Sequence, residues 1–258
     1  MYHVLLVVLL LFSVHEYFSK KTIKGIDNLL FMTLLILVTI RYGQGSDYFS
    51  YIYLFSNSAD TFEIAIDTKD LRYITQEIGF AAISYFWIKI LSLSPEALSA
   101  LYSAVSFTLV WLFIKKHSHK PITSLFLYYC TFYLVYPYSG IRQAICISIF
   151  IYFLIPLLQK RNYFKYYILS LLLFLIHYSS IILFFIPVVN LVKKYTLTQV
   201  YFFSIVAFGI GLFLYQFLFS FFASLDTIGA KVDSYTEQES FEMLSVLLRL
   251  VIFIPIMQ

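Results

Sequence analysis

The sequence predicts an all-α fold, a polytopic bundle of transmembrane helices with about nine spans. Of its 258 residues, 61% are hydrophobic and only 12% are charged, whereas a water-soluble domain usually carries about 25% charged residues. Apolar runs long enough for helical spans recur from end to end. A helix satisfies its backbone polar groups internally, as the bilayer interior requires.

Lysine and arginine clusters orient the predicted spans. The first apolar run, residues 1–18, precedes Lys20 and Lys21, the reverse of the order in a cleaved signal peptide. It predicts a retained span with an external N-terminus, because positive charge favours the cytoplasmic side. The predicted spans are residues 1–18, 28–40, 96–114, 122–138, 141–158, 163–176, 178–192, 199–222 and 243–258. The basic residues form no continuous face, so no nucleic-acid partner is predicted.

Residues 43–93 form a long external loop in this topology, because residues 43–75 are too polar to span the membrane. Apolar residues at i, i+3, i+4 and i+7 predict an amphipathic helix over residues 47–55 on the membrane surface. These residues are Tyr48, Tyr51, Ile52 and Phe55. Residues 75–93 predict a second interfacial helix, with a full span as the alternative. We favour the interfacial helix, because a helix that lies on the membrane surface keeps the later lysine clusters in the cytoplasm.

Residues 163–192 carry His177 in the middle and basic residues at both ends. This pattern predicts a hairpin of two short helices of about 14 residues, each reaching about 21 Å. The bend at His177 would form the floor of an outward-facing cavity. The last predicted span, residues 243–258, is short and has no basic tail. We therefore expect residues 1–258 to be a single polytopic membrane domain, C-terminally truncated from a longer protein.

Four ionisable residues from separate segments fall on the external side: Arg41, Asp47, Arg142 and His177. Two guanidinium groups suit the oxygens of an anion such as phosphate. The alternatives are structural: Arg142 extending to the interface, Asp47 capping the following helix, and His177 satisfied at a bend. No residue set matches a protein metal site, so we predict neither a metal nor another cofactor.

Three short motifs occur in order at these positions. They are Arg41-Tyr-Gly-Gln-Gly-Ser-Asp47-Tyr48 followed by Tyr51, Gly140-Ile-Arg142-Gln143, and Ile176-His177-Tyr-Ser179. Together they resemble the EpsG family of Wzy-like polysaccharide polymerases, over residues 23–194.

The resemblance implies a multi-pass glycosyltransferase of the bacterial inner membrane with a GT-C-like architecture. Such an enzyme polymerises polyprenyl-pyrophosphate-linked repeat units into exopolysaccharide, capsule or O-antigen on the external face. Its partners would be the lipid-linked oligosaccharide, the bilayer, a flippase and a chain-length regulator. The residues that we expect to act are Asp47 and His177 in catalysis, and Arg41, Arg142, Gln143, Tyr48 and Tyr51 in substrate binding.

Three other activities remain as alternatives. An O-antigen ligase-like transferase shares the substrate class and the chemistry. A membrane acyltransferase would place its catalytic histidine near a carboxylate, and His177 has none within its own hairpin. A polysaccharide transporter would show charged residues deep in several spans, whereas these spans are nearly free of ionisable groups apart from Arg142 and His177.

Overall fold

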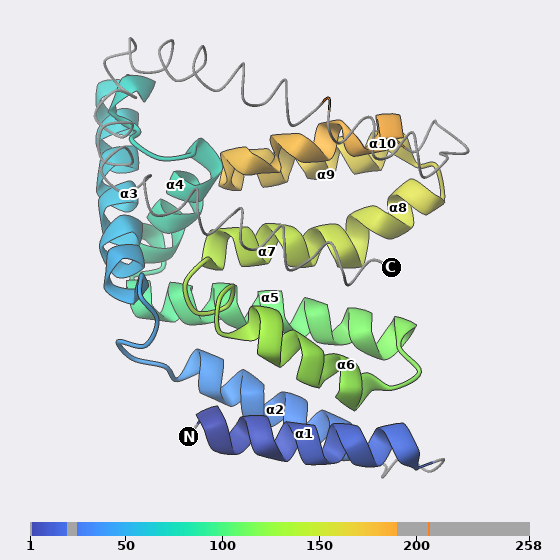
Figure 1. Ribbon diagram of the computed structural model, residues 1–258. Coiled ribbons are helices and arrows are strands. Elements are labelled where there is room, and N and C mark those ends of the chain that lie inside the picture. Colours follow the sequence, from blue (N-terminus) through green and yellow to red (C-terminus); the bar gives the residue numbers. More distant parts are fainter. Residues whose placement is uncertain (1, 20–24, 190–205, 207–258) are drawn as a thin grey trace. The chain divides into compact units, whose positions relative to one another are not determined.

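A computed structural model describes residues 2–19, 25–189 and 206 (Figure 1). The chain divides into two compact units, Met1–Leu191 and Val192–Gln258. The described residues form helices and contain no strand, so the predicted all-α class is confirmed for them. The predicted spans 199–222 and 243–258 lie outside the described residues. The GT-C-like arrangement and the single domain stay predictions.

Within the first unit, most helices lie side by side in a row (Figure 1). The helices of this row are α1 (Tyr2–Phe18), α2 (Ile26–Thr39), α5 (Pro95–His117), α6 (Pro121–Tyr128), α7 (Ile141–Ile149) and α9 (Tyr163–Ile176). At one end of the row, α3 (Tyr48–Thr68) runs across it and packs against α4 (Ile78–Tyr85). This is the end at which α5 and α7 begin.

Among the described residues, two helices are long and apolar enough to cross a membrane, judged by length and composition. One is α5, and the other is Ile141–Gln159, which joins α7 through a π-helical turn at Phe150–Leu154 to α8 (Ile155–Gln159). Four further apolar helices are shorter: Tyr2–Phe18, Ile26–Thr39, Ile78–Ile90 and Tyr163–Ile176. A 14-residue helix is about 21 Å long, so such helices match a full span only where the bilayer thins or flanking residues extend to the interface.

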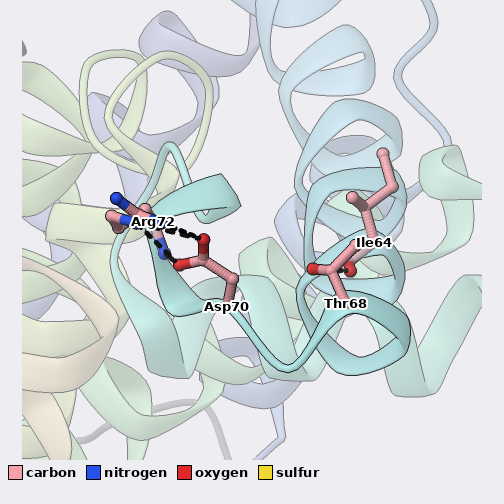
Figure 2. Close-up of polar contacts among 4 residues, drawn as sticks. All are labelled: Ile64, Thr68, Asp70 and Arg72. Atoms are coloured by element: carbon pink, nitrogen blue, oxygen red, sulfur yellow. Dashed lines mark hydrogen bonds and ion pairs between the residues drawn. The ribbon is translucent and has the colours of Figure 1, made fainter.

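The predicted amphipathic helix of residues 47–55 is present but longer, because α3 continues to Thr68. The predicted apolar face packs in part against other helices, since Tyr48 and Phe55 are buried within the protein while Tyr51 and Ile52 are partly buried; its contact with the membrane surface stays a prediction. Figure 2 shows how the helix ends. The Thr68 hydroxyl donates to the Ile64 carbonyl at 2.7 Å, and Lys69 then adopts a left-handed conformation with φ 55°.

An exposed ion pair lies at the start of the short 3₁₀ helix Leu71–Tyr73 that follows. Asp70 and Arg72 approach to 2.7 Å (Figure 2), and the Asp70 carboxylate also accepts the backbone N–H of Arg72. The chain then enters α4, which continues as a π-helical turn at Phe86–Ile90. Lys89 in this turn pairs with Asp60 and Glu63 of α3, both at 2.8 Å. The helix predicted over residues 75–93 is therefore present, and its place relative to the membrane stays a prediction.

The hairpin around His177 is confirmed in its bend but not in its second arm. Helix α9 has 14 residues and ends at Ile176, where His177 takes an extended conformation with φ −154°. The chain returns as a 3₁₀ helix, Tyr178–Phe184, followed by α10 (Ile186–Val189). A continuous second α-helix is not formed. Pro187 lies at this junction, and proline cannot donate the backbone hydrogen bond that a continuous helix needs.

Helix α1 supplies a side-chain cap to the start of α6. Glu16 of α1 is buried, and its carboxylate accepts the backbone N–H groups of Ile122 and Thr123 at 3.2 and 2.7 Å. The Thr123 hydroxyl donates to the same carboxylate at 2.9 Å. The first N–H groups of a helix have no partner within it, so Glu16 satisfies the start of α6 from another segment.

Candidate functional site

The loop between α2 and α3 closes against the turn that precedes α7. Gly45 has φ +104°, and a Cβ atom built on it would lie 2.7 Å from the Tyr138 carbonyl oxygen. A larger residue would fit neither the conformation nor the space. The glycine of this motif therefore allows close contact between two backbone segments. The same two segments are joined by the Ser46 and Ser139 hydroxyls, which lie 3.1 Å apart.

Arg41 lies inside this contact rather than on a free surface. Its guanidinium donates to the Tyr138 carbonyl and, at 3.4 Å, to the Ser103 hydroxyl of α5. The Arg41 Cζ atom lies 4.8 Å from the centroid of the Tyr138 ring and 5.7 Å from that of Tyr48. We call Arg41, Tyr48, Ser103 and Tyr138 the Arg41 cluster. The guanidinium is therefore held in place by protein groups, while its buried Nε has no hydrogen-bond partner among the described residues.

A second group of ionisable residues forms around Glu77, which immediately precedes α4. Arg142 Nη1 lies 2.5 Å from Glu77 Oε2, and His177 Nδ1 lies 3.4 Å from Glu77 Oε1. The backbone N–H of Tyr178 donates to the same Oε1 at 3.4 Å. We call Glu77, Arg142 and His177 the Glu77 cluster. It joins the starts of α4 and α7 to the bend after α9.

The carboxylate of Glu77 is ionised throughout the physiological range. Burial alone would raise the pKa of Glu77, but the contact with His177 and the charge of Arg142 outweigh it and lower the pKa to about 2. Arg142 is the second residue of α7, where the helix dipole disfavours a cation. The negative charge of Glu77 offsets this cost, so the ion pair allows an arginine at the start of the helix.

Aromatic rings and a cavity border the Glu77 cluster. The Arg142 Cζ atom lies 4.9 Å from the centroid of the Phe80 ring and 5.9 Å from that of Tyr51. Beside the cluster is a cavity of about 260 Å³, lined by Gln143 and His177 together with mostly apolar residues. This volume is below the range of about 300–1,000 Å³ usual for drug-sized ligands. The cavity would therefore take one part of a larger molecule.

Several buried polar atoms at this site have no aligned hydrogen-bond partner among the described residues. They are Nε of Arg142 and both ring nitrogens of His177. Most buried polar groups in proteins are paired, and an exception calls for an explanation such as a functional role or an unseen ligand. His177 lines the cavity, so a ligand with hydrogen-bonding groups is one such explanation for its ring nitrogens.

The structure brings together some of the residues singled out from the sequence. Arg142 and His177 meet through Glu77, with Tyr51 over the guanidinium and Gln143 at the neighbouring cavity. Arg41 and Tyr48 belong to the separate Arg41 cluster. Asp47 is exposed and precedes α3 without a side-chain cap, so it belongs to neither cluster. Its expected role as a base stays a prediction, as does the sharing of one pocket by all four ionisable residues.

Glu77 was not predicted as a site residue. Its contact with Arg142 spans 65 positions in the sequence, and no local sequence pattern predicts a pairing over that separation. One signal was present, because Glu77 is an isolated carboxylate at the start of an apolar, aromatic-rich segment. An acidic residue in such a place is costly unless it is paired. No group of three His, Cys, Asp or Glu side chains suited to a metal occurs in the described part of the chain, and metal independence stays a prediction.

The apolar helices and the ionic cluster at one end of their row define a helical membrane protein with a polar site. The sequence model of the EpsG family matches residues 26–258, and the chain belongs to the EpsG family. The predicted resemblance is confirmed, and the match extends beyond residues 23–194 at the C-terminal side. This family is associated with polysaccharide polymerase-like membrane proteins, which makes the chain a membrane protein of polysaccharide biosynthesis. No curated protein and no solved structure matches the chain.

Proposed function

We propose that the protein is a membrane glycosyltransferase that polymerises polyprenyl-pyrophosphate-linked repeat units into exopolysaccharide, capsule or O-antigen. The observation that carries the proposal is the meeting of Arg142 and His177 beside the cavity at one end of the helical row. Family membership supports a lipid-linked saccharide as the substrate class. The Glu77 cluster supplies a cation, Arg142, and a proton acceptor, His177. Glycosyl transfer from a diphosphate needs both kinds of group.

The proposed reaction forms one bond and breaks one. An acceptor hydroxyl attacks the anomeric carbon of the donor sugar, the bond from that carbon to the diphosphate breaks, and the carrier diphosphate leaves with the electron pair. Arg142 stabilises the negative charge that develops on the leaving group. His177 accepts the hydroxyl proton, with Asp47 as the alternative base. No step requires a metal or another cofactor.

The other predicted residues have supporting roles in this proposal. Tyr51 and Gln143 border the Glu77 cluster and its cavity, so they would contact the sugar or the diphosphate. Tyr48 lies in the Arg41 cluster, which would hold the loop bearing Asp47 in place. Arg41 would contact the diphosphate through donors that the Arg41 cluster does not use, such as its Nε.

A membrane acyltransferase is a second candidate, and one observation favours it. The sequence argument against it was the absence of a carboxylate partner within the hairpin of His177. The structure supplies such a partner from another segment, Glu77. Family membership still favours glycosyl transfer.

The lipid-linked species that accumulates in a deletion strain tests the proposal. A single repeat unit on the carrier supports a polymerase. Finished polymer on the carrier indicates a ligase instead, and neither species indicates an acyltransferase or a transporter. In the complemented strain, Arg142→Ala should abolish or shorten the polymer. Polymer of wild-type length from this variant would show that Arg142 does not stabilise the diphosphate leaving group.

The proposed location is the bacterial inner membrane, with the N-terminus and the site on the external face, next to a flippase and a chain-length regulator. Membrane-impermeant labelling of single cysteines at positions 44 and 117 tests this orientation. Gln44 lies in the loop before α3 and His117 ends α5. We expect label from outside at position 44 and not at position 117. The opposite result would reverse the orientation.

A further inference from the structure

Glu77 occupies a position that its own helix does not explain. It immediately precedes α4, yet its side chain makes no capping hydrogen bond to that helix. Its side chain is 8% exposed, and its two oxygens face Arg142 of α7 and His177 after α9. One carboxylate from a third segment thus contacts both residues to which the proposed function assigns a chemical role.

Nδ1 of His177 lies 3.4 Å from Glu77 Oε1 without an aligned hydrogen bond, and this approach favours one position of the ring proton. An ionised carboxylate only accepts hydrogen bonds, and the low pKa of Glu77 keeps it ionised. In a singly protonated ring the carboxylate therefore favours the proton on Nδ1, the nitrogen that faces it, and leaves Nε2 with its lone pair. His177 also lines the cavity, where a base would meet the acceptor hydroxyl.

The contact with Arg142 restricts the guanidinium. Nη1 is held by Glu77 at 2.5 Å, and Phe80 packs against the guanidinium group. An arginine fixed in this way loses little further rotational freedom when it binds an anion. Both contacts use the same carboxylate, so a displacement of Glu77 would move both groups.

We propose that Glu77 is a positioning residue that holds Arg142 and His177 in a fixed relative geometry and keeps His177 in the Nδ1–H tautomer. The role in transfer rests on the proposed function, whereas the tautomer does not. An aspartate beside the histidine of a Ser-His-Asp triad acts in the same way.

The tautomer is measured by ¹⁵N NMR of histidine-labelled full-length protein in detergent micelles. The chain has five histidines, and a His177→Gln variant assigns the relevant signals. We expect Nδ1–H in the wild type and a loss of this preference in Glu77→Gln, because an amide can accept or donate. Glu63→Gln is the matched control, since it removes one carboxylate of an exposed ion pair with Lys89. An Nε2–H tautomer in the wild type, or an unchanged Nδ1–H tautomer in Glu77→Gln, would overturn the proposal.

Turnover of a lipid-linked repeat unit by the purified protein gives the second measurement. We expect Glu77→Gln to lower kcat by up to about 100-fold, the lower end of what a positioned general base contributes, Glu77→Asp to recover part of it, and Glu63→Gln to leave it unchanged. An active wild type with an equally active Glu77→Gln variant refutes the positioning role alone. A wild type that makes no polymer, but whose tautomer depends on Glu77, refutes the proposed function alone.

Folding is controlled separately, because removing one partner of a buried ion pair strongly destabilises a protein. If Glu77→Gln does not fold, the double variant Glu77→Gln/Arg142→Gln removes both charges together and serves for the same tautomer measurement. Retention of the Nδ1–H tautomer in the folded double variant contradicts the proposal, and its loss supports it.

Discussion

The guanidinium of Arg41 donates a hydrogen bond to the main-chain carbonyl of Tyr138, 97 positions further along the sequence. The contact joins the segment after α2 to the turn before α7, and the loop at Gly45 closes against the same carbonyl. The start of α3 and the start of α7 are therefore fixed relative to each other. Each carries a residue of the site, Tyr51 and Arg142.

Replacing Arg41 should lower the free energy of unfolding of the protein. Arg41→Ala leaves the buried Tyr138 carbonyl and Ser103 hydroxyl with one donor fewer, which costs about 1–3 kcal/mol. Arg41→Lys should recover only part of this, because one ammonium cannot reproduce the planar set of donors. Denaturant unfolding in detergent measures the free energy of unfolding. Unchanged stability together with shortened polymer would assign Arg41 to substrate binding instead.

Gly45→Ala should destabilise more than Gly25→Ala. Both glycines have positive φ, +104° and +90°, but only Gly45 has an atom within 3 Å of an added Cβ, the Tyr138 oxygen at 2.7 Å. The conformational cost of about 1–3 kcal/mol is common to both variants, and the clash is added only at Gly45. Thermal unfolding of the two variants isolates that clash. Equal losses of stability in the two variants would mean that the loop at Gly45 moves away from the Tyr138 carbonyl at no cost in free energy.

Gly79→Ala tests the packing of α4 on α9. An added Cβ would lie 2.8 Å from the Leu175 carbonyl oxygen, so we expect a net loss of stability although alanine favours helix by about 1 kcal/mol. Gly140→Ala is the control, because its nearest atom, in the Gln143 side chain, is 3.4 Å away. A stabilised Gly79→Ala protein would show that these helices are not in close contact.

The stability given by Glu77 should depend on pH in a defined window. Its pKa is about 2 in the folded protein and ordinarily 4.5, so its contribution is fully present above about pH 4.5 and is lost as the pH falls toward 2. The stability difference between wild type and Glu77→Gln should therefore shrink from about pH 5 to about pH 3. Unfolding midpoints at several pH values measure it. A constant difference over this window would show that Glu77 is not held as a carboxylate.

Lys89→Met should change stability by less than about 1 kcal/mol, because the partners of Lys89 are exposed and screened by solvent. The Asp60 and Glu63 side chains are 58% and 42% exposed. Arg142→Met removes the guanidinium partner of the buried Glu77 carboxylate, so it should lower the free energy of unfolding by clearly more than Lys89→Met does. Similar losses from both variants would mean that α4 depends on its contact with α3 as much as on the Glu77 cluster.

The sequence was sufficient for features set by local pattern. Apolar spacing predicted a helix at the start of α3, and charge at both ends of residues 163–192 predicted the bend at His177. Features set by contacts between segments were not predictable in this way. The π-helical turn at Phe86–Ile90 and the partner of Arg142 depend on what packs against them, which no spacing within one helix encodes.

Glu16 gives the first helix a role in the part of the chain that defines the family. The family match begins at residue 26, after α1, yet two backbone amides at the start of α6 donate to Glu16. Swapping α1 for an unrelated apolar helix would keep the hydrophobic surface and lose this carboxylate. Such a chimera would need another hydrogen-bond acceptor near Thr123, because the first turn of α6 would otherwise lose the partner of its backbone N–H groups.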